Sequence, residues 1–212
     1  MIEIIPGITE KNWDAFVAKV ALVAPFTQWI HLNVSDGSMG TPETLTDVSK
    51  LTEIASSYPE LRIEVHLLTA NPEKYVRPLA DSGVKRLIAH VESNDPRLFL
   101  EAVKFDEVEV GLALDGTTEV EQLEPFLEEI DFVSIMTAEA GVSGGTFLPE
   151  AVEKVKLIRQ NYPDLPIEVV GGITDVTVKA VKDAGATRIV AGDYIFHDPG
   201  AAAEAIESLK SI

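Results

Sequence analysis

Two histidines in short alternating apolar and polar runs are the residues of this sequence best suited to chemistry. His31 lies in the run at 30–37, and His66 lies in the run at 62–67. Alternation with a period of two is typical of a strand, and it places Asn33 on the same face as His31. If the two strands are neighbours, both imidazoles converge on one pocket, where they could bind a metal ion or move protons.

Two glutamates accompany this pair. Glu64 shares a strand face with His66, and a third run at 167–173 places Glu168 on the face of Val170 before it ends in paired glycines. Carboxylates at these positions are candidate metal ligands beside the histidines. A further histidine, His90, follows another apolar run, and we expect it to have a packing role.

Composition excludes several classes of protein. The chain has 212 residues, of which 17 are Lys or Arg and 35 are Asp or Glu, so its formal net charge is −18. Nucleic acid and anionic membranes bind positive patches, so neither is expected as a partner. The sequence contains no cysteine, which excludes disulfides and thiolate ligands. We expect a cytoplasmic protein, because the amino-terminal segment lacks a basic region and a long apolar run.

Apolar runs alternate with helical patterns along the whole chain, which predicts a single domain over residues 1–212. Strands are expected at 2–5, 29–34, 62–67, 86–90, 108–114, 132–136, 167–170 and 188–191. Helices are expected at 12–23, 43–57, 72–82, 96–103, 120–127, 150–161, 176–184 and 199–209. Eight strand and helix pairs predict a (β/α)8 TIM barrel, with an open doubly wound sheet as the alternative. The carboxyl ends of the strands would then build the site, with these rim candidates: His31, Asn33, His66, His90, Met136, Val170 and Gly192.

Several ordered motifs match one known family. They are the run 30–37, Val65-His66-Leu67-Leu68 with Asn71-Pro72-Glu73, His90-Val91-Glu92, Ile135-Met136-Thr137, and the tail from 167 to 196. With these motifs the chain resembles ribulose-phosphate 3-epimerases over nearly its whole length. The resemblance implies a (β/α)8 barrel. It also implies an isomerase of carbohydrate metabolism that interconverts D-ribulose 5-phosphate and D-xylulose 5-phosphate, a reaction of the pentose phosphate pathway.

The resemblance also implies a divalent metal, Zn, Fe, Mn or Co, between two histidines and two aspartates that move the protons. His31 and His66 match the histidines, whereas Asn33 and Val170 stand at the aspartate positions. An amide and an isopropyl group cannot act as acid or base, so no catalytic residue of the pair is intact and the activity is expected to be weak or lost. The ligands of the metal would be His31 and His66, with Asn33 or Glu64, and the metal is expected to bind weakly.

The resemblance implies that phosphate is held by backbone N–H groups from three places: a loop after strand six, paired glycines after strand seven, and a short helix after strand eight. The matching residues are Gly141, Val142, Ser143, Gly144, Gly171, Gly172, Gly192 and Asp193. Asp193 replaces a small donor, and if its carboxylate caps the short helix it would repel an anion, so weak phosphate binding is our hypothesis. Further pocket positions are Gly7, Ser35, Leu68 and Met136, and the first three depart from the family pattern.

Three functions follow from these observations. The first is the family epimerase, and the second is an enzyme with different chemistry on a related sugar or sugar phosphate. The third is a descendant without catalysis that serves in binding or assembly. In each case the expected partner is a small sugar or sugar-phosphate ligand, with a homo-oligomer as a further possibility.

Overall fold

The structure is a computed structural model that describes residues 2–104, 107–140 and 144–212. Within these residues the strands are β1 Glu3–Ile8, β2 Trp29–Ser35, β3 Arg62–Leu68, β4 Arg86–His90, β5 Glu109–Leu114, β6 Phe132–Met136, β7 Ile167–Val170 and β8 Arg188–Ala191. The helices are α1 Trp13–Val23, α2 Leu51–Ser57, α3 Glu73–Asp81, α4 Pro96–Val103, α5 Glu150–Asn161, α6 Val178–Ala184, α7 Asp193–Phe196 and α8 Ala202–Ser211. Shorter 3-10 segments are η1 Ala24–Phe26, η2 Val48–Lys50, η3 Val120–Phe126 and η4 Pro199–Ala201.

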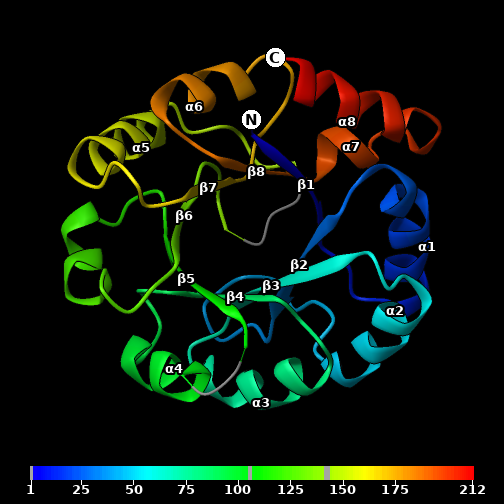
Figure 1. Ribbon diagram of the computed structural model, residues 1–212, viewed down its shortest axis with the longest axis horizontal. Coiled ribbons are helices and arrows are strands. Elements are labelled where there is room, and N and C mark those ends of the chain that lie inside the picture. Colours follow the sequence, from blue (N-terminus) through cyan, green and yellow to red (C-terminus); the bar gives the residue numbers. More distant parts are fainter. Residues whose placement is uncertain (1, 105–106, 141–143) are drawn as a thin grey trace.

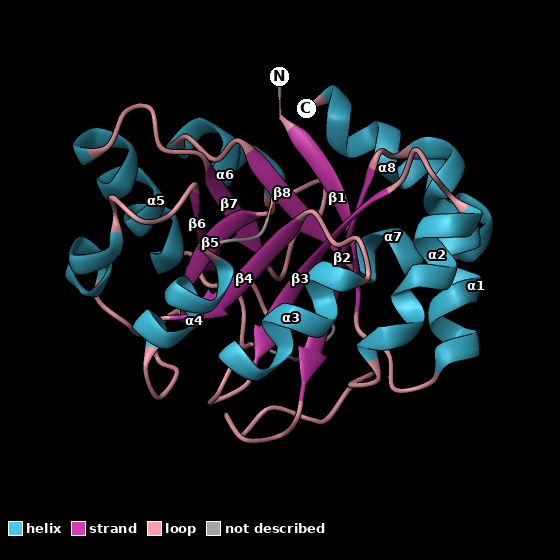
Figure 2. Ribbon diagram, turned by 60° about the horizontal axis from the view of Figure 1, so that its bottom comes forward, coloured by secondary structure: helices cyan, strands magenta, loops and turns pink. Residues whose placement is uncertain are grey.

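The strands are all parallel and close into a barrel in sequence order, with the helices around the outside (Figures 1 and 2). Closure comes from β1, which pairs with β2 on one side and with β8 on the other, where Ile5 lies opposite Val190. The (β/α)8 barrel is therefore confirmed, and the open doubly wound sheet is wrong.

The helix predicted at 43–57 is wrong in its first part. The described chain becomes helical only at Val48, because Thr44 is bonded to the end of β2 instead. Its amide donates to the Ser35 carbonyl at 2.9 Å, and its hydroxyl donates to the Asn33 carbonyl at 2.8 Å. These bonds hold the segment extended along the strand end, next to the mouth of the barrel.

The helix predicted at 120–127 is a 3-10 helix, η3, rather than an α-helix. Pro125 lies inside it and cannot donate a backbone hydrogen bond, which disfavours a regular α-helix. Lys154 also donates to the carbonyls of Asp115, Gly116 and Thr118, which holds the chain before η3 in a turn. A short helix after strand eight, implied by the family resemblance, is present as α7.

Alternation along the strands separates two packed regions. Leu32 and Val34 of β2 belong to the large core between the barrel and its helices, whereas His31 points into the barrel and contacts Glu64. Inside the barrel, Ile88 and Phe132 pack in one small apolar cluster. The expected division of β2 into two faces is confirmed.

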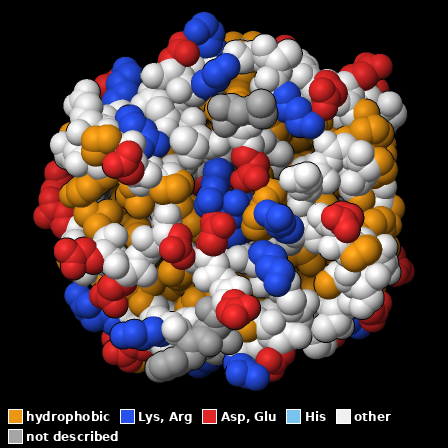
Figure 3. All heavy atoms as spheres, in the orientation of Figure 1, with side chains coloured by type: hydrophobic (Ala, Val, Ile, Leu, Met, Phe, Trp, Pro, Cys, Tyr) orange, Lys and Arg blue, Asp and Glu red, His pale blue; other side chains and the backbone are white. Residues whose placement is uncertain are grey.

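Ion pairs fill the barrel at the amino ends of the strands. Arg86 donates to Glu3 and to Glu109, each at 2.9 Å, and Arg188 donates to Glu109 at 2.8 Å. The guanidinium of Arg86 also lies 3.5 Å from the centre of the Trp29 ring. Figure 3 shows acidic and basic side chains gathered at the centre of the barrel on the face that it displays. No helix in the described residues combines the length and apolar character needed to cross a membrane.

We predict that Gly111→Ala destabilises the barrel by about 1 to 3 kcal/mol. A Cβ at this position would lie 2.6 to 2.9 Å from three ring carbons of Phe132, which is fully buried in the barrel interior. Urea denaturation measures the free energy of unfolding. The double variant Gly111→Ala with Phe132→Leu should recover part of the loss, because it removes the clashing ring. A single variant as stable as the unchanged chain would contradict this packing.

Candidate functional site in the mouth of the barrel

Three histidines from neighbouring strands lie in a row inside the carboxyl end of the barrel. The ring centroids of His31 and His66 are 5.4 Å apart in an edge-to-face arrangement, and those of His66 and His90 are 4.8 Å apart and nearly parallel. All three side chains are buried. The convergence of His31 and His66, predicted from alternation, is confirmed. His90 joins them, because β4 is the next strand of the barrel.

His31 is fixed at both ring nitrogens. Its Nδ1 lies 2.7 Å from Glu64 Oε1, and its Nε2 lies 3.1 Å from Asn33 Oδ1. The Asn33 amide nitrogen donates to the Thr9 hydroxyl at 2.9 Å, so the amide oxygen faces the imidazole. Both ring nitrogens therefore face oxygen atoms, and burial lowers the pKa of His31.

His66 is the unsatisfied member of the row. Neither of its ring nitrogens has a hydrogen-bond partner among the described residues, although the side chain is fully buried. Burial holds the pKa of His66 well below its usual range, and His90 and His31 add to this effect, so the ring is neutral. Buried polar atoms nearly always have a partner, so His66 is an exception among the described residues.

Two buried glutamates lie beneath His31. Glu64 Oε2 is 3.2 Å from Arg86 Nη1, so its charge is shared between a guanidinium and an imidazole. Glu168 accepts from the Ser134 hydroxyl at 2.9 Å. Burial, together with the charge of Glu64, raises the pKa of Glu168 to about 8. Burial raises the pKa of Glu64 to about 7 even though Arg86 opposes this. Glu168 is therefore the protonated partner at neutral pH.

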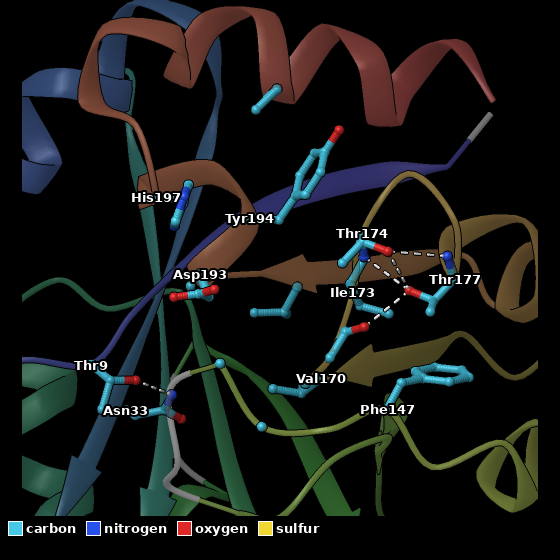
Figure 4. Close-up of a pocket in the computed structure, with 18 of the residues that line it drawn as sticks. Thr9, Asn33, Phe147, Val170, Ile173, Thr174, Thr177, Asp193, Tyr194 and His197 are labelled. Atoms are coloured by element: carbon cyan, nitrogen blue, oxygen red, sulfur yellow. Dashed lines mark hydrogen bonds between the residues drawn. The ribbon is translucent and has the colours of Figure 1, made fainter.

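A cavity of about 460 Å³ opens above this layer (Figure 4). Its floor is apolar, because Val170 packs in one cluster with Met136 and Val190. Thr9 and Asn33 supply polar groups on one wall, where the hydrogen bond between them is drawn in Figure 4. Other lining residues are Glu139, Phe147, Ile173, Thr174, Thr177, Tyr194, His197 and Asp198. The volume is that of an ordinary small-molecule site.

Glycines form the wall on the side of β6, β7 and β8. Gly171 and Gly172 have φ angles of 107° and 64°, and Gly144 has a φ of 71°, which only glycine adopts readily. A Cβ at Gly172 would lie 2.7 Å from the Phe147 backbone, so the close approach of these two loops requires a glycine. These three and Gly192 line the cavity, whereas Gly141, Val142 and Ser143 lie outside the described residues.

The sequence left open whether Asp193 caps the short helix, and in the structure it does not. The N-cap of α7 is Gly192, and the Asp193 side chain makes no capping hydrogen bond. Its carboxylate instead faces Gly144, with its oxygens 3.4 and 3.5 Å from where a Cβ of that glycine would be. Figure 4 shows this carboxylate pointing into the cavity, on the side of Thr9 and Asn33. A negative charge therefore lies in the glycine wall.

The remaining predicted pocket residues are divided between two cavities. Gly7 and Met136 line the large one, and Leu68 lines a smaller cavity of about 180 Å³ together with His90. Ser35 lines neither of them, because its buried hydroxyl bonds to Thr41 at 2.7 Å. Sequence reasoning did not select Thr9, Glu139 or Tyr194 as site residues. Thr9 directly follows β1, but this strand was predicted to end at residue 5 and extends to Ile8, so no signal in the sequence pointed to Thr9.

Glu92 is a further residue of the mouth that sequence reasoning gave no role. It accepts from the Asp115 amide at 2.9 Å, and its Oε2 lies 3.0 Å from His90 Nδ1. Burial alone would raise the pKa of Glu92, but these hydrogen bonds and one from Thr118 lower it to about 2. Glu92 therefore orients the third histidine ring, and the spacing of two residues at a strand end was the signal for it.

Comparison with known proteins places this chain in one family. The sequence model of the ribulose-phosphate 3-epimerase family matches residues 3–196. The chain is 36% identical over 173 residues to a ribulose-phosphate 3-epimerase of Schizosaccharomyces pombe, which covers 81% of this chain and 76% of the relative. It is 34% identical to the cytoplasmic isoform from Oryza sativa, covering 98% and 92% of the two chains. The chain belongs to the ribulose-phosphate 3-epimerase family.

Solved structures share the fold at lower identity. KGPDC from Streptococcus mutans superposes with a TM-score of 0.78 at 17% identity over 100% of this chain and 98% of that one. The 3-hexulose-6-phosphate synthase from Salmonella typhimurium gives 0.76 at 18% identity, with 99% of each chain covered. At this identity the likeness shows the barrel fold alone.

The donors in the mouth do not fit the two-histidine, two-aspartate metal site that the resemblance implies. Val170 offers no ligand atom, and His31 Nε2 is engaged with Asn33. One atom each from His31, Glu64 and Glu168 lie within 4.8 Å of one another, a spacing that could hold a metal ion. Arg86 and the proton on Glu168 already balance much of the charge of that buried group.

We predict that the free energy of unfolding falls as the pH rises from about 6.5 to about 8. The pKa of Glu168 is raised from 4.5 to about 8 in the folded chain, so the folded state keeps a proton that the unfolded chain has released. Raising the pH therefore favours unfolding. Glu64, whose pKa is raised to about 7, acts in the same direction as Glu168, whereas the lowered pKa values of His31 and His66 act in the opposite direction, mainly below pH 6.5.

Chemical denaturation at several pH values measures this slope. Glu168→Gln should reduce the slope and leave the part that Glu64 contributes, whereas Glu128→Gln, which removes the same charge from the surface, should leave the slope unchanged. Equal slopes in the unchanged chain and in Glu168→Gln would show that Glu168 is ionised in the fold.

Proposed function

We propose that this chain binds a small sugar-like ligand in the mouth of its barrel and has weak or no epimerase activity toward ribulose 5-phosphate. The observation that carries the proposal is the state of the two positions where the resemblance implies catalytic aspartates. Asn33 is held between Thr9 and His31, and Val170 packs into the apolar floor. Neither side chain can take up or release a proton near neutral pH.

The size of the effect follows from the role of each group. A positioned acid or base is worth roughly 10² to 10⁴ in rate, and epimerisation at C3 requires one on each face of the carbon. The titratable side chains two residues before these positions on the same strands are His31 and Glu168, and both are fully buried. His31 is separated from the cavity by its hydrogen bond to Asn33, and Glu168 lies below it. Neither is placed to replace a missing aspartate at the floor.

A second candidate function is different chemistry on a related sugar, with His31 as the base. The observation that favours it is the 2.7 Å contact between His31 and the buried Glu64 carboxylate. A carboxylate behind an imidazole fixes the ring and stabilises its protonated form. A ligand that displaced Asn33 from His31 Nε2 would then meet an oriented general base. Transfer of a proton from the ligand to His31 is the feature that separates this candidate from binding alone.

We infer weak binding of divalent metal for the same reason that catalysis is weak. Two imidazoles and an amide oxygen are neutral donors, and the carboxylates that would add negative charge are missing from positions 33 and 170. We also infer that the chain works in the cytoplasm, supported by its acidic composition and by the cytoplasmic isoform among its relatives.

Exchange of the C3 proton of ribulose 5-phosphate with deuterated water tests the main proposal. We expect the unchanged chain to show exchange at least about 10⁴-fold slower than an active epimerase, because two roles are lost. The double variant Asn33→Asp with Val170→Asp should gain exchange, since the barrel and the histidine row are retained.

Each single variant is the matched control. Restoring only one aspartate leaves one face of the carbon without its acid or base, so each should stay well below the double variant. Robust exchange by the unchanged chain would refute the proposal. Slow exchange by the unchanged chain that is lost in His31→Gln would favour the second candidate.

Metal content provides a separate test. Purified chain exchanged into metal-free buffer and then given one equivalent of Zn²⁺ should retain much less than one ion per chain after dialysis, as measured by mass spectrometry. Asn33→Asp should raise the affinity for Zn²⁺ by about tenfold or more, because it adds a charged ligand beside His31, and the retained metal should rise accordingly. Leu157→Asp, which places a carboxylate on the outer surface, is the control and should have no effect. Stoichiometric retention by the unchanged chain would contradict weak binding.

A further inference from the structure

The charge of the mouth cavity differs from that of a pocket built for an anion. Its described lining residues include the acidic side chains of Glu139, Asp193 and Asp198 and contain no lysine or arginine. The chain as a whole carries a net charge of −18, so the long-range field also disfavours an anionic ligand. The groups that could favour an anion are the backbone N–H groups of the glycine wall and the hydroxyl, amide and imidazole donors of the lining.

Asp193 places a carboxylate against that wall. Its oxygens lie 3.4 and 3.5 Å from the Cβ position of Gly144, and no capping hydrogen bond within the described part of α7 occupies them. Figure 4 shows the side chain directed into the cavity rather than back along α7. A carboxylate with free lone pairs accepts hydrogen bonds and repels a second anion.

The rest of the cavity is suited to a neutral ligand that offers hydroxyl groups. Asn33 and Thr9 provide polar atoms on the side of the cavity to which Asp193 points. Met136, Val170 and Val190 form an apolar floor that suits the carbon face of a sugar chain. A polyol could therefore bond to these polar groups with its hydroxyls and pack its carbon chain on the floor.

We propose that the cavity selects an unphosphorylated sugar or sugar alcohol, and that Asp193 accepts a hydrogen bond from its terminal hydroxyl. The proposal rests on the proposed function, because it names the ligand of the same pocket. Asp193 is then the residue that determines specificity: the same carboxylate that binds a hydroxymethyl group excludes a phosphate ester from the glycine wall.

Calorimetric binding of two matched probes, D-ribulose and D-ribulose 5-phosphate, tests this. The unchanged chain should bind D-ribulose at least about tenfold more tightly than the phosphate ester, since only the ester brings charge against Asp193. Asp193→Asn keeps the shape and removes the charge. It should bind the ester about tenfold more tightly than the unchanged chain does, and should bind D-ribulose more weakly.

Glu139→Gln is the matched control, because it removes an equal charge from the same cavity without touching Gly144. It should change the affinity ratio of the two probes by much less than Asp193→Asn does. Circular dichroism and thermal unfolding establish that both variants keep the fold.

Three outcomes would overturn the inference: equal or tighter binding of the ester by the unchanged chain, no gain in Asp193→Asn, or an equal gain in Glu139→Gln. These binding ratios are independent of C3 proton exchange. A chain that exchanges the C3 proton refutes the proposed function, whereas a chain that fails to exchange it but prefers the phosphate ester refutes only the assignment of the ligand.

Discussion

The buried carboxylate of Glu64 connects the two ends of this barrel. On one side it pairs with Arg86, which in turn bonds to Glu3 at the amino ends of the strands. On the other side it bonds to His31, which leads to the mouth. A buried charge is costly unless it is paired and hydrogen-bonded, so the position of each member fixes that of the next. His31 is therefore oriented from beneath, by groups that no ligand touches.

In this arrangement the groups that orient His31 from beneath are separate from Asn33 and Val170, which line the mouth. Asn33 is satisfied by Thr9 and His31, and Val170 adds apolar contact with Met136 and Val190. Both side chains fit their surroundings without leaving a polar group unpaired. An amide and an apolar floor therefore lie at the two positions where the resemblance implies an acid and base pair. Among the described residues, the two ring nitrogens of His66 still have no hydrogen-bond partner.

Much of the fold was predictable, because the strands of a parallel barrel are buried on both faces and appear as short apolar runs between helical patterns, and the chain contains eight such units. The failures came where contacts between distant residues override local preference. The segment at 43–47 has a helical pattern, but Thr44 bonds to the end of β2 and keeps it extended. Asp193 directly follows a glycine before a helix, a pattern typical of a cap, yet its carboxylate turns toward Gly144 from another strand's loop.

The sequence by itself determined the barrel, the family, the convergence of His31 and His66, and the residue types at positions 33 and 170, because these depend on residue identity and on periodicity along the chain. Tertiary structure alone decided how the site is charged. Only the packed barrel brings Glu168 beside Glu64 and thereby keeps it protonated, and only the folded loops aim Asp193 into the cavity. The physical reason is that pKa values and ligand preference depend on distances between strands and on burial, and neither can be read along one chain.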